Sequence, residues 1–270
     1  HNYQNSHYYD GNDPTKRTWP GYDAYAQTRE AQAYIRDHAA SDNPFLLFVG
    51  FGGPHFPHDN APEDLKALYP PEDIQLRPNV SEDQSERSRK ELQGYYAHCT
   101  AIDACVGELY QTVQEAGIDD DTVFIFTSDH GDMHGSHGKG SCRKQLPWDE
   151  SVRVPFLCRY PAVHRGGRTE TTPLNTPDIL PSLLSLAGIP VPDTIEGDDL
   201  SPVFRGGETD RDRAVLFMSV APFTAGAADF KAYRGVRTSQ YTYVRNSDGP
   251  WLLYDNIEDP FQKNNLVDTP

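Results

Sequence analysis

The sequence predicts an α/β fold with a mostly parallel sheet between helices, followed by a small antiparallel sheet at the C-terminal end. Two observations lead to this prediction. Continuous apolar runs of strand length alternate with helical patterns, which is typical of parallel strands that helices cover on both faces. After about residue 205 the chain instead contains short strand candidates with turns between them. We therefore expect one domain at residues 1–205 and a smaller one at residues 206–270.

The first part of the chain is predicted to begin with a helix and a buried strand. Residues 24–40 are rich in alanine and other good helix formers, which predicts a helix with a weak apolar stripe. The run "FLLFVGF" at residues 45–51 has the length and unbroken apolar character of a strand buried on both faces. Residues 52–88 are rich in Pro, Asp and Glu, and we expect a long irregular connection there.

The middle of the chain contains the strongest helical pattern. Apolar residues recur at three- and four-residue steps over residues 89–117, and Gly117 at the end of this range is a typical stop signal. Two further apolar runs, "TVFIFTS" at residues 122–128 and "VPFLCRY" at residues 154–160, predict strands.

The last predicted helix covers residues 177–187. Thr176 followed by Pro177 is typical of an N-cap and a first helical turn, and Gly188 closes the pattern. The small antiparallel sheet is predicted from four short segments, "AVLFMSV", "AYRGVRT", "YTYVRN" and "WLLYDN".

The composition restricts the partners of this chain. Its 270 residues carry a formal net charge of −16, which argues against binding to nucleic acid or anionic membranes, because their phosphates would be repelled. No apolar run approaches the ~18 residues of a membrane-spanning helix. The first residues lack an initiating Met and a signal peptide, so export is not readable from them. The cysteines are too sparse for a disulfide scaffold, and we expect buried or half-buried thiols at Cys99, Cys105, Cys142 and Cys158.

The segment "FTSDHGDMHGSHGKG" at residues 126–140 is the main candidate for a functional site. Asp129 and His130 come directly after a predicted strand, at the edge of an α/β sheet where ligands bind. A carboxylate beside an imidazole can bind a divalent metal, and the surrounding glycines let the backbone bend closely around a bound group. The same two residues can also simply cap the next turn, and spacing alone leaves both interpretations open.

Two further patterns in this region point to a ligand. His130, His134 and His137 could hold zinc if they shared a helix face, although the glycines disfavour a helix and no glutamate stands between the first two histidines. Basic residues gather just after the acid–histidine pair, which suits an anionic group such as sulfate or phosphate, although many basic loops are only solvated. These basic residues are Lys139, Arg143, Lys144 and Arg153.

A second candidate is His55, within "GFGGPHFPH" at residues 50–58. This segment also follows the end of a predicted strand, so His55 can face the same cleft as Asp129. An imidazole titrates near neutrality and can donate a proton to a leaving group. A histidine in a loop can equally be structural, and His58 has the weaker functional case.

Together these segments resemble the sulfatase family of the alkaline-phosphatase-like superfamily. The resemblance is carried, in the family's order, by "GGPHFPH", "FTSDHGDMHGSHG", "KQLPWDESVRVPF" and "TPDILPSLLSLAGIPVPDTIEGDDLSPVFRG". The tail "YRGVRTSQYTYV…LYDNIEDPFQKNNLV" is similar to the family's C-terminal subdomain. The resemblance covers nearly all of residues 40–267 and implies an alkaline-phosphatase-like α/β fold, here incomplete.

The resemblance also implies roles for particular residues. Asp129 and His130 match the family's metal-binding acid and the Asn or His beside it. Lys144 matches the lysine that contacts the sulfate, because it stands at the family's usual distance before the "RVP" strand, whereas Lys139 does not. His55 matches the histidine that contacts the substrate near the leaving oxygen. The family's metal is usually calcium, and His130 leaves magnesium or manganese open because calcium prefers oxygen ligands.

The chain departs from the family's pattern in the parts that belong to the N-terminal half. Family members use a Cys or Ser in a Cys/Ser-x-Pro/Ala-x-Arg motif, which is converted to formylglycine, and no cysteine of this chain stands in that motif. The early Asp-Asp metal pair and the Lys-x-His segment are also missing. We therefore expect the C-terminal portion of a sulfatase, inactive alone, whose N-terminal half is its missing partner. The resemblance implies a periplasmic or secreted enzyme.

The predicted function is hydrolysis of a sulfuric ester on a sulfated small molecule or carbohydrate, with Ca²⁺, or alternatively Mg²⁺ or Mn²⁺, as cofactor. One alternative is a phosphonate or phosphate-ester hydrolase of the same superfamily. Another, from a different class, is a non-catalytic chain that serves as a structural or partner-binding subunit.

Overall fold

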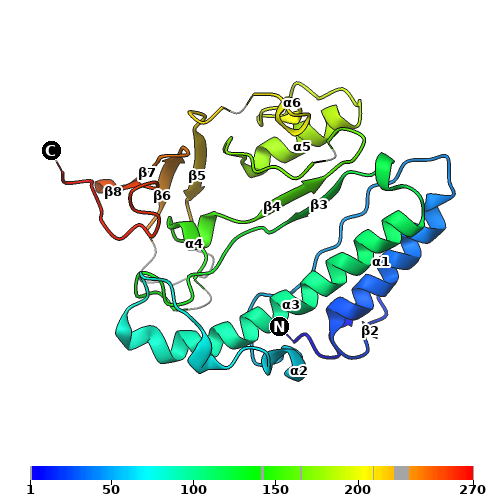
Figure 1. Cartoon of the computed structure of the whole chain (residues 1–270), viewed down its shortest axis with the longest axis horizontal. Coiled ribbons are helices and arrows are strands. Elements are labelled where there is room, and N and C mark those ends of the chain that lie inside the picture. The colour runs from blue at the N-terminus through cyan, green and yellow to red at the C-terminus, as the bar shows by residue number, and fades with distance from the viewer. Residues whose placement is uncertain (1, 141–142, 165, 209, 222–230, 270) are drawn as a thin grey trace. The chain divides into compact units, whose positions relative to one another are not determined.

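A computed structural model describes residues 2–140, 143–164, 166–208, 210–221 and 231–269 (Figure 1). Within it the chain forms two compact units. The first consists of His1–Thr127, Asp132–Arg143 and Pro155–Tyr160, and the second of Ser128–Gly131, Lys144–Val154 and Pro161–Pro270. The domain boundary predicted at residue 205 stays a prediction.

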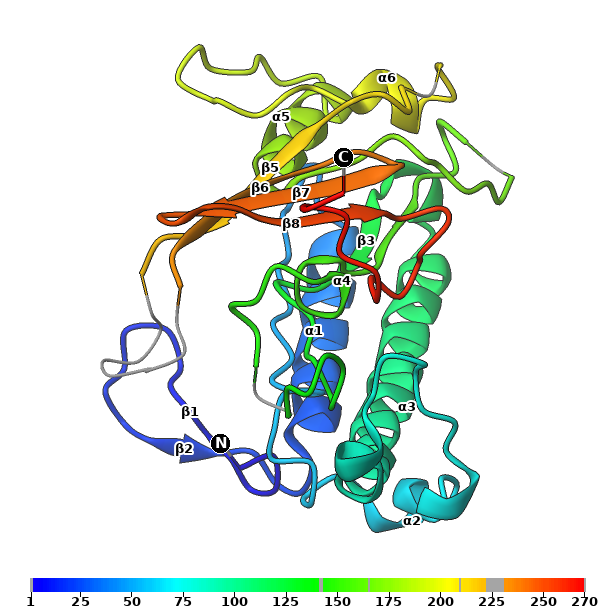
Figure 2. The ribbon, with the colours of Figure 1, turned by 90° about the vertical axis from the view of Figure 1, so that its left-hand side faces the viewer.

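The first unit is built on two long helices, α1 (Asp23–Ala39) and α3 (Ser85–Glu115), which lie side by side (Figures 1 and 2). Both helices confirm the sequence prediction. Their facing apolar side chains form a buried cluster of Ala31, Ile35, Leu109 and Val113. Burying a side chain of the size of Leu or Ile contributes roughly 1.5–3 kcal/mol, so this cluster stabilises the pairing of the two helices.

The strands of the first unit correct one detail of the predicted sheet. Strands β3 (Phe124–Thr127) and β4 (Phe156–Arg159) form as expected, but they pair antiparallel, with Ile125 opposite Cys158. A parallel arrangement was the expectation. The pairing nevertheless keeps the α/β class, because the two strands and the long helices belong to the same unit.

Residues 45–51 differ from the buried strand that the sequence predicts. In the part of the chain that the structure describes, this segment pairs with no strand. One side packs against the α1–α3 cluster through Leu47, Val49 and Phe51, while Leu46 and Phe48 face outwards. A strand buried on both faces needs a covering partner, and the described residues supply cover on one face only.

Short elements complete the first unit. The connection at residues 52–88 contains α2 (Glu63–Lys66) and two turns of 3₁₀ helix, η1 (Pro71–Asp73) and η2 (Glu82–Gln84). A third such turn, η3 (Asp119–Asp121), precedes β3. Near the N-terminus, β1 (His7–Tyr8) and β2 (Arg17–Thr18) form a small antiparallel pair.

The second unit contains the predicted antiparallel sheet. Its strands are β5 (Val215–Ser219), β6 (Tyr233–Arg237), β7 (Tyr241–Asn246) and β8 (Gly249–Asp255), in that order, and every pairing is antiparallel. Figure 2 shows the strands following one another across the sheet. Alternate residues of a strand point to the same side of a sheet, and here one side is apolar. The buried cluster on this side consists of Tyr233, Val244, Leu252 and Tyr254.

Three helices accompany this sheet: α4 (Asp149–Val152), α5 (Thr176–Leu186) and α6 (Ser201–Phe204). The sequence places the N-cap of α5 at Thr176, one residue too late. The N-cap is Asn175, whose side chain accepts a hydrogen bond from the Thr176 N–H, and Asp178 completes a capping box. Asp178 also forms an ion pair with Arg213, whose nitrogen lies 3.0 Å from its carboxylate.

Two further expectations concern membranes and cysteines. No helix among the described residues is long and apolar enough to cross a membrane. Cys99 is half-buried and Cys105 is buried, as predicted, but Cys158 is exposed, because the side chains of β4 are largely uncovered on that face. Cys142 lies outside the described residues.

Candidate active site

The acid–histidine pair predicted from the sequence is formed in the second unit. Asp129 exposes 84% of its side chain, whereas His130 exposes 27%. The Nε2 atom of His130 lies 3.5 Å from Oδ2 of Asp129. The other carboxylate oxygen of Asp129 accepts a hydrogen bond from the His130 backbone N–H at 3.0 Å. The backbone therefore holds the carboxylate beside the ring and leaves it accessible.

The contacts of His130 decide which ring atom is available for chemistry. Its Nδ1 lies 2.8 Å from the carbonyl oxygen of Gly131. A carbonyl can only accept, so Nδ1 carries the hydrogen. In the neutral ring, Nε2 then has a lone pair directed toward the side of the Asp129 carboxylate. Two acceptor atoms 3.5 Å apart fit a cation that both contact, and a carbonyl that orients the second ring nitrogen is the usual support of a metal-binding histidine.

The pair would be only part of a complete set of ligands. Among the described residues, no group of three or more His, Cys, Asp or Glu side chains is placed to hold a metal ion. Calcium takes six to eight oxygen ligands, and magnesium takes six. The geometry thus fits two ligands of such a site.

The competing zinc interpretation lacks the helix that it requires. The described residues 131–140 contain no helix, and His134 and His137 have positive φ angles of 43° and 53°. His134 packs its ring 4.4 Å from Tyr95, centroid to centroid. The Nε2 atom of His137 lies 3.1 Å from the side-chain nitrogen of Asn79. Both rings therefore serve packing within the first unit.

Lys144 belongs to the same unit as the acid–histidine pair, and a single serine joins the two segments. Ser151, in α4, is buried, and its hydroxyl donates to the carbonyl oxygen of Lys144 at 2.6 Å. Its own carbonyl oxygen accepts from the N–H of Gly131 at 2.8 Å. The backbone at Gly131 and the backbone at Lys144 are therefore both bonded to Ser151, and so to the same helical turn.

Gly131 is required at this contact because the backbone of α4 comes very close. A Cβ atom on Gly131 would lie 2.0 Å from the carbonyl oxygen of Glu150, a distance that no side chain tolerates. A larger residue would push the acid–histidine segment away from α4.

His55 lies in the first unit, where its ring is half-buried. Its Nδ1 is 2.8 Å from the carbonyl oxygen of Phe56, and since a carbonyl can only accept, this nitrogen carries a hydrogen. Tyr3 donates to the backbone carbonyl of His55 at 2.8 Å and fixes the loop. The cleft that His55 is predicted to share with Asp129 stays a prediction.

His58 is buried against a second histidine, His98, for which no sequence pattern gives a signal. Both rings are buried, and burial lowers the pKa of each to about 4, with the nearby His134 contributing at His58. Nδ1 of His98 shares a hydrogen bond with the Tyr22 hydroxyl at 2.7 Å. His98 belongs to the helix for which the sequence predicted only an apolar stripe. These rings are held neutral near pH 7.

Sequence reasoning also missed Asp149, which is buried at the start of α4 and bonded to the C-terminal sheet. An available signal was its place within "KQLPWDESVRVPF", five residues after Lys144, where a charged residue precedes a buried serine.

Comparison with known proteins identifies the family. The model of the sulfatase family matches residues 1–189, and that of the N-sulphoglucosamine sulphohydrolase C-terminal region matches residues 135–270. Since the first match spans more than half of the chain, the chain belongs to the sulfatase family. This confirms the resemblance found in the sequence, while the missing formylglycine motif stays a prediction.

Two curated relatives show how much of a sulfatase the chain represents. An ulvan-active sulfatase of Formosa agariphila is 45% identical over 271 residues, which cover 100% of this chain and 53% of that protein. An endo-4-O-sulfatase of Bacteroides thetaiotaomicron is 28% identical, with 98% of this chain and 56% of that protein covered. The chain thus spans about half the length of the curated relatives it matches.

Solved structures confirm the predicted fold class. A glycosaminoglycan-metabolism protein of Bacteroides thetaiotaomicron matches with a TM-score of 0.86 and 27% identity, over 99% of this chain and 59% of that chain. The phosphonate monoester hydrolase of Agrobacterium radiobacter matches with a TM-score of 0.69 and 25% identity, over 90% of this chain and 56% of that chain.

Proposed function

We propose that this chain is the C-terminal portion of a metal-dependent sulfatase that hydrolyses a sulfate ester on a carbohydrate. The observation that carries the proposal is the Asp129–His130 pair, whose acceptor atoms lie 3.5 Å apart, in a chain of the sulfatase family. The substrate class rests on the relatives, because one is named an ulvan-active sulfatase and another an N-acetylglucosamine-6-O-sulfatase.

In this proposal Asp129 and His130 hold the metal, with Ca²⁺ as the first choice and Mg²⁺ or Mn²⁺ as alternatives. A bound divalent ion would supply positive charge next to the sulfuryl oxygens. Asp129 would bind through its exposed carboxylate and His130 through Nε2, since Nδ1 is engaged by the Gly131 carbonyl. The hydrogen bond at Nδ1 keeps the ring oriented and favours a basic Nε2.

In this proposal Lys144 and His55 would act on different atoms of the sulfate ester. The ammonium group of Lys144 would stabilise the sulfuryl oxygens, whose charge is present with every sulfate ester. His55 would protonate the leaving oxygen through Nε2. As the nucleophile that we assign to the N-terminal half forms a bond to sulfur, the bond between sulfur and the leaving oxygen breaks. That oxygen takes the electron pair, and the proton from His55 neutralises it as an alcohol.

The first unit supports the proposal that an N-terminal portion completes the fold. Leu46 and Phe48 expose 86% and 90% of their surfaces on the segment at residues 45–51. Covering two such side chains is worth roughly 1.5–3 kcal/mol each, and a neighbouring strand would also pair the backbone edge. We propose the N-terminal half of the same sulfatase as the occupant, with the nucleophile and the remaining metal ligands, in a periplasmic or secreted enzyme.

The test is an assay of two proteins. The purified 270-residue chain should not turn over an aryl sulfate or a sugar sulfate, whereas a protein that also contains the N-terminal half should. Robust turnover by the 270-residue chain alone would contradict the proposal that a portion is missing. If the longer protein were also inactive on both substrates, the non-catalytic alternative, a structural or partner-binding chain, would replace the sulfatase proposal.

A second candidate function is phosphonate or phosphate-ester hydrolysis, which the likeness to a phosphonate monoester hydrolase favours. Lys144 and a divalent ion suit a phosphoryl group as well as a sulfuryl group, because both present anionic oxygens. Matched nitrophenyl esters of sulfate and phenylphosphonate, assayed on the longer protein, separate the two by their ratio of kcat/KM.

A further inference from the structure

We propose that Asp149 is a positioning residue: it is clamped by Arg237 and Gln262 of the C-terminal sheet region, and through α4 it fixes the backbone that carries Lys144 and the acid–histidine pair. This inference rests on the proposed function for the roles of Lys144 and Asp129. The contacts themselves all lie within the second unit, and the site residues were not predicted to depend on the C-terminal sheet.

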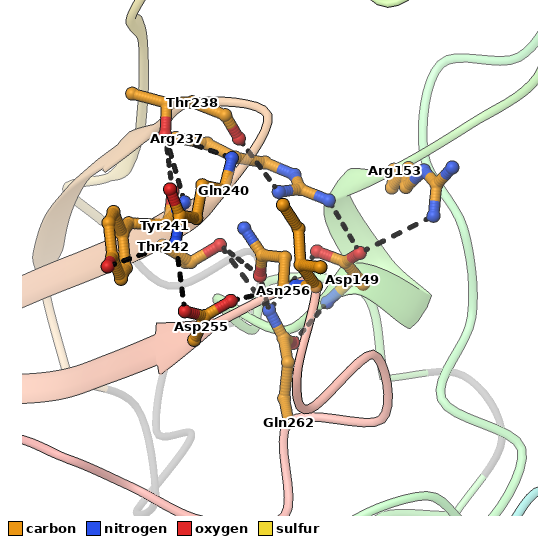
Figure 3. A network of polar contacts seen from close by, with 11 residues as sticks. Asp149, Arg153, Arg237, Thr238, Gln240, Tyr241, Thr242, Asp255, Asn256 and Gln262 are labelled. Atoms are coloured by element: carbon orange, nitrogen blue, oxygen red, sulfur yellow. Dashed lines mark hydrogen bonds and ion pairs between the residues drawn. The ribbon is translucent and has the colours of Figure 1, made fainter. Parts of the chain in front are cut away.

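The clamp holds both oxygens of one buried carboxylate (Figure 3). Arg237, the last residue of β6, donates to Oδ2 of Asp149 at 2.8 Å. Gln262 donates from Nε2 to Oδ1 of Asp149 at 3.2 Å and accepts from the Asp149 backbone N–H at 2.9 Å. Charge-assisted bonds to a buried carboxylate are stronger than neutral ones, so these contacts fix the first residue of α4 in position and direction.

Gln262 is itself locked in place. It is 2% exposed and has a positive φ of 51°, a conformation that is uncommon outside glycine. The same amide nitrogen, which has two hydrogens to share, also lies 3.2 Å from Oδ1 of Asn256 and 3.4 Å from Oγ1 of Thr242. Thr242 in turn donates to Asn256 at 2.9 Å. The tail after β8 and the start of β7 are therefore connected to α4 through the side-chain amide of Gln262.

These contacts continue from Asp149 through α4 to the site, and we call the series Arg237–Asp149–Ser151 the relay. Two residues after Asp149, Ser151 bonds to the backbone of both site segments, to Lys144 at 2.6 Å and to Gly131 at 2.8 Å. Since α4 is a single turn of four residues, it transmits any shift of Asp149 to Ser151. A displacement there would move Lys144 and Asp129 relative to each other without touching either side chain.

The second unit offers a matched control for this relay. Arg213 and Asp178 form another buried arginine–aspartate pair, at 3.0 Å, with side chains 14% and 4% exposed. The corresponding values for Arg237 and Asp149 are 2.8 Å, 17% and 9%. Asp178 belongs to α5, and its carboxylate bonds to Arg213 and to the backbone N–H groups of Asn175 and Asp198, all of which lie outside the site segments. Breaking this second pair should therefore remove similar stability without disturbing the contacts of Asp149.

Arg237→Ala, Arg237→Lys and Arg213→Ala are compared in the longer, active enzyme, at a temperature where all are folded. Loss of a partner that supports site residues typically costs 10–100-fold in activity. We expect Arg237→Ala to lower kcat by about that factor with KM nearly unchanged, and Arg237→Lys to restore part of it because the charge remains. Arg213→Ala should lower Tm comparably and keep kcat within about twofold.

Hydrogen exchange on the 270-residue chain separates this proposal from the proposed function. The Gly131 amide should exchange faster in Arg237→Ala than in wild type, and unchanged in Arg213→Ala. Equal exchange at Gly131 in both variants, or equal losses of kcat, would overturn the positioning role. If exchange changes as expected but no sulfate ester is hydrolysed by the longer protein, the relay stands and the proposed sulfatase activity falls.

Discussion

The stretch of residues 126–140 is divided between the two units, and its residues 128–131 are used differently from residues 132–140. In the first of these parts, which belongs to the second unit, Asp129 exposes most of its side chain and forms a pair of possible ligands with His130. In the other part, which belongs to the first unit, His134 packs against Tyr95, and burial lowers its pKa. Histidines four residues apart thus differ in role because they pack against different elements.

The comparison shows why residue type and spacing do not identify a metal site on their own. Each histidine has one ring nitrogen close to a hydrogen-bond partner, a carbonyl for His130 and an amide for His137. What separates them is the group that lies beside Nε2. His130 has a carboxylate at 3.5 Å that leaves room for a cation, whereas His137 is bonded to Asn79, which is a donor.

The sharpest test of this division is removal of Asp129. In the longer, active enzyme, Asp129→Ala should lower kcat/KM by roughly 10³-fold or more, because a carboxylate ligand is lost from a metal that supplies several kcal/mol of charge stabilisation. His137→Ala, the control from the other part of the stretch, should cost only a few-fold. Bound metal is measured by elemental analysis after desalting. Loss of metal from His134→Ala and His137→Ala but not from Asp129→Ala would favour the zinc interpretation.

His55→Ala should have the next largest effect, and only on substrates with a poor leaving group. A general acid contributes roughly 10²–10⁴-fold when the leaving alkoxide needs a proton. The loss in kcat/KM should approach that range on a sugar sulfate and be much smaller on nitrophenyl sulfate, because nitrophenolate leaves without protonation. Similar losses on the two substrates would restrict His55 to binding or to the structure of its loop.

Lys144→Ala should reduce activity on both substrates alike. Removal of a group that stabilises charge on the transferring oxygens costs about 10²–10³-fold in kcat. Lys139→Ala is the matched control, since Lys139 lies closer in sequence to the acid–histidine pair but its segment is bonded locally, Gly135 N–H to Lys139 carbonyl at 2.7 Å. Comparable losses from both lysines would show that a diffuse positive charge, and not Lys144 in particular, matters.

The sequence predicts the helices and the small sheet well because their signals are local. The apolar period of α3 and the turn before β8 depend on neighbouring residues only, and both elements formed within a few residues of the prediction. The contact between Asp129 and His130 was likewise visible, since the two residues are adjacent in the chain, whereas their role as metal ligands stays a prediction. The cap of α5 was misplaced by one residue because Asn175 and Thr176 are both good capping residues.

Sequence patterns did not predict the long-range contacts, and the reason is physical. The direction of β4 beside β3 depends on how the chain returns between them, which periodicity does not encode. The clamp on Asp149 joins residues 88 and 113 positions apart, and the side chains give no local hint of it. His58 and His98 are a third case, since nothing in a loop and a helix pattern indicates that the two rings are buried together.

The smallest expected effect concerns these buried histidines and is a loss of stability in acid. The folded pKa of His58 and of His98 is about 4, below the ordinary value of 6.5. Between pH 6.5 and pH 4 the unfolded chain therefore binds more protons than the folded one, so the free energy of unfolding falls as the pH falls.

By pH 5 the loss in the free energy of unfolding is about 2 kcal/mol for each ring. Urea unfolding of the 270-residue chain at pH 7.5 and pH 5.0 measures it, and His98→Gln should show a smaller dependence on pH than the wild type, because His58 and His134 still have lowered pKa values. A free energy of unfolding that is the same at both pH values would show that burial does not hold these rings neutral, and the difference between His130 and His134 would then rest on their packing alone.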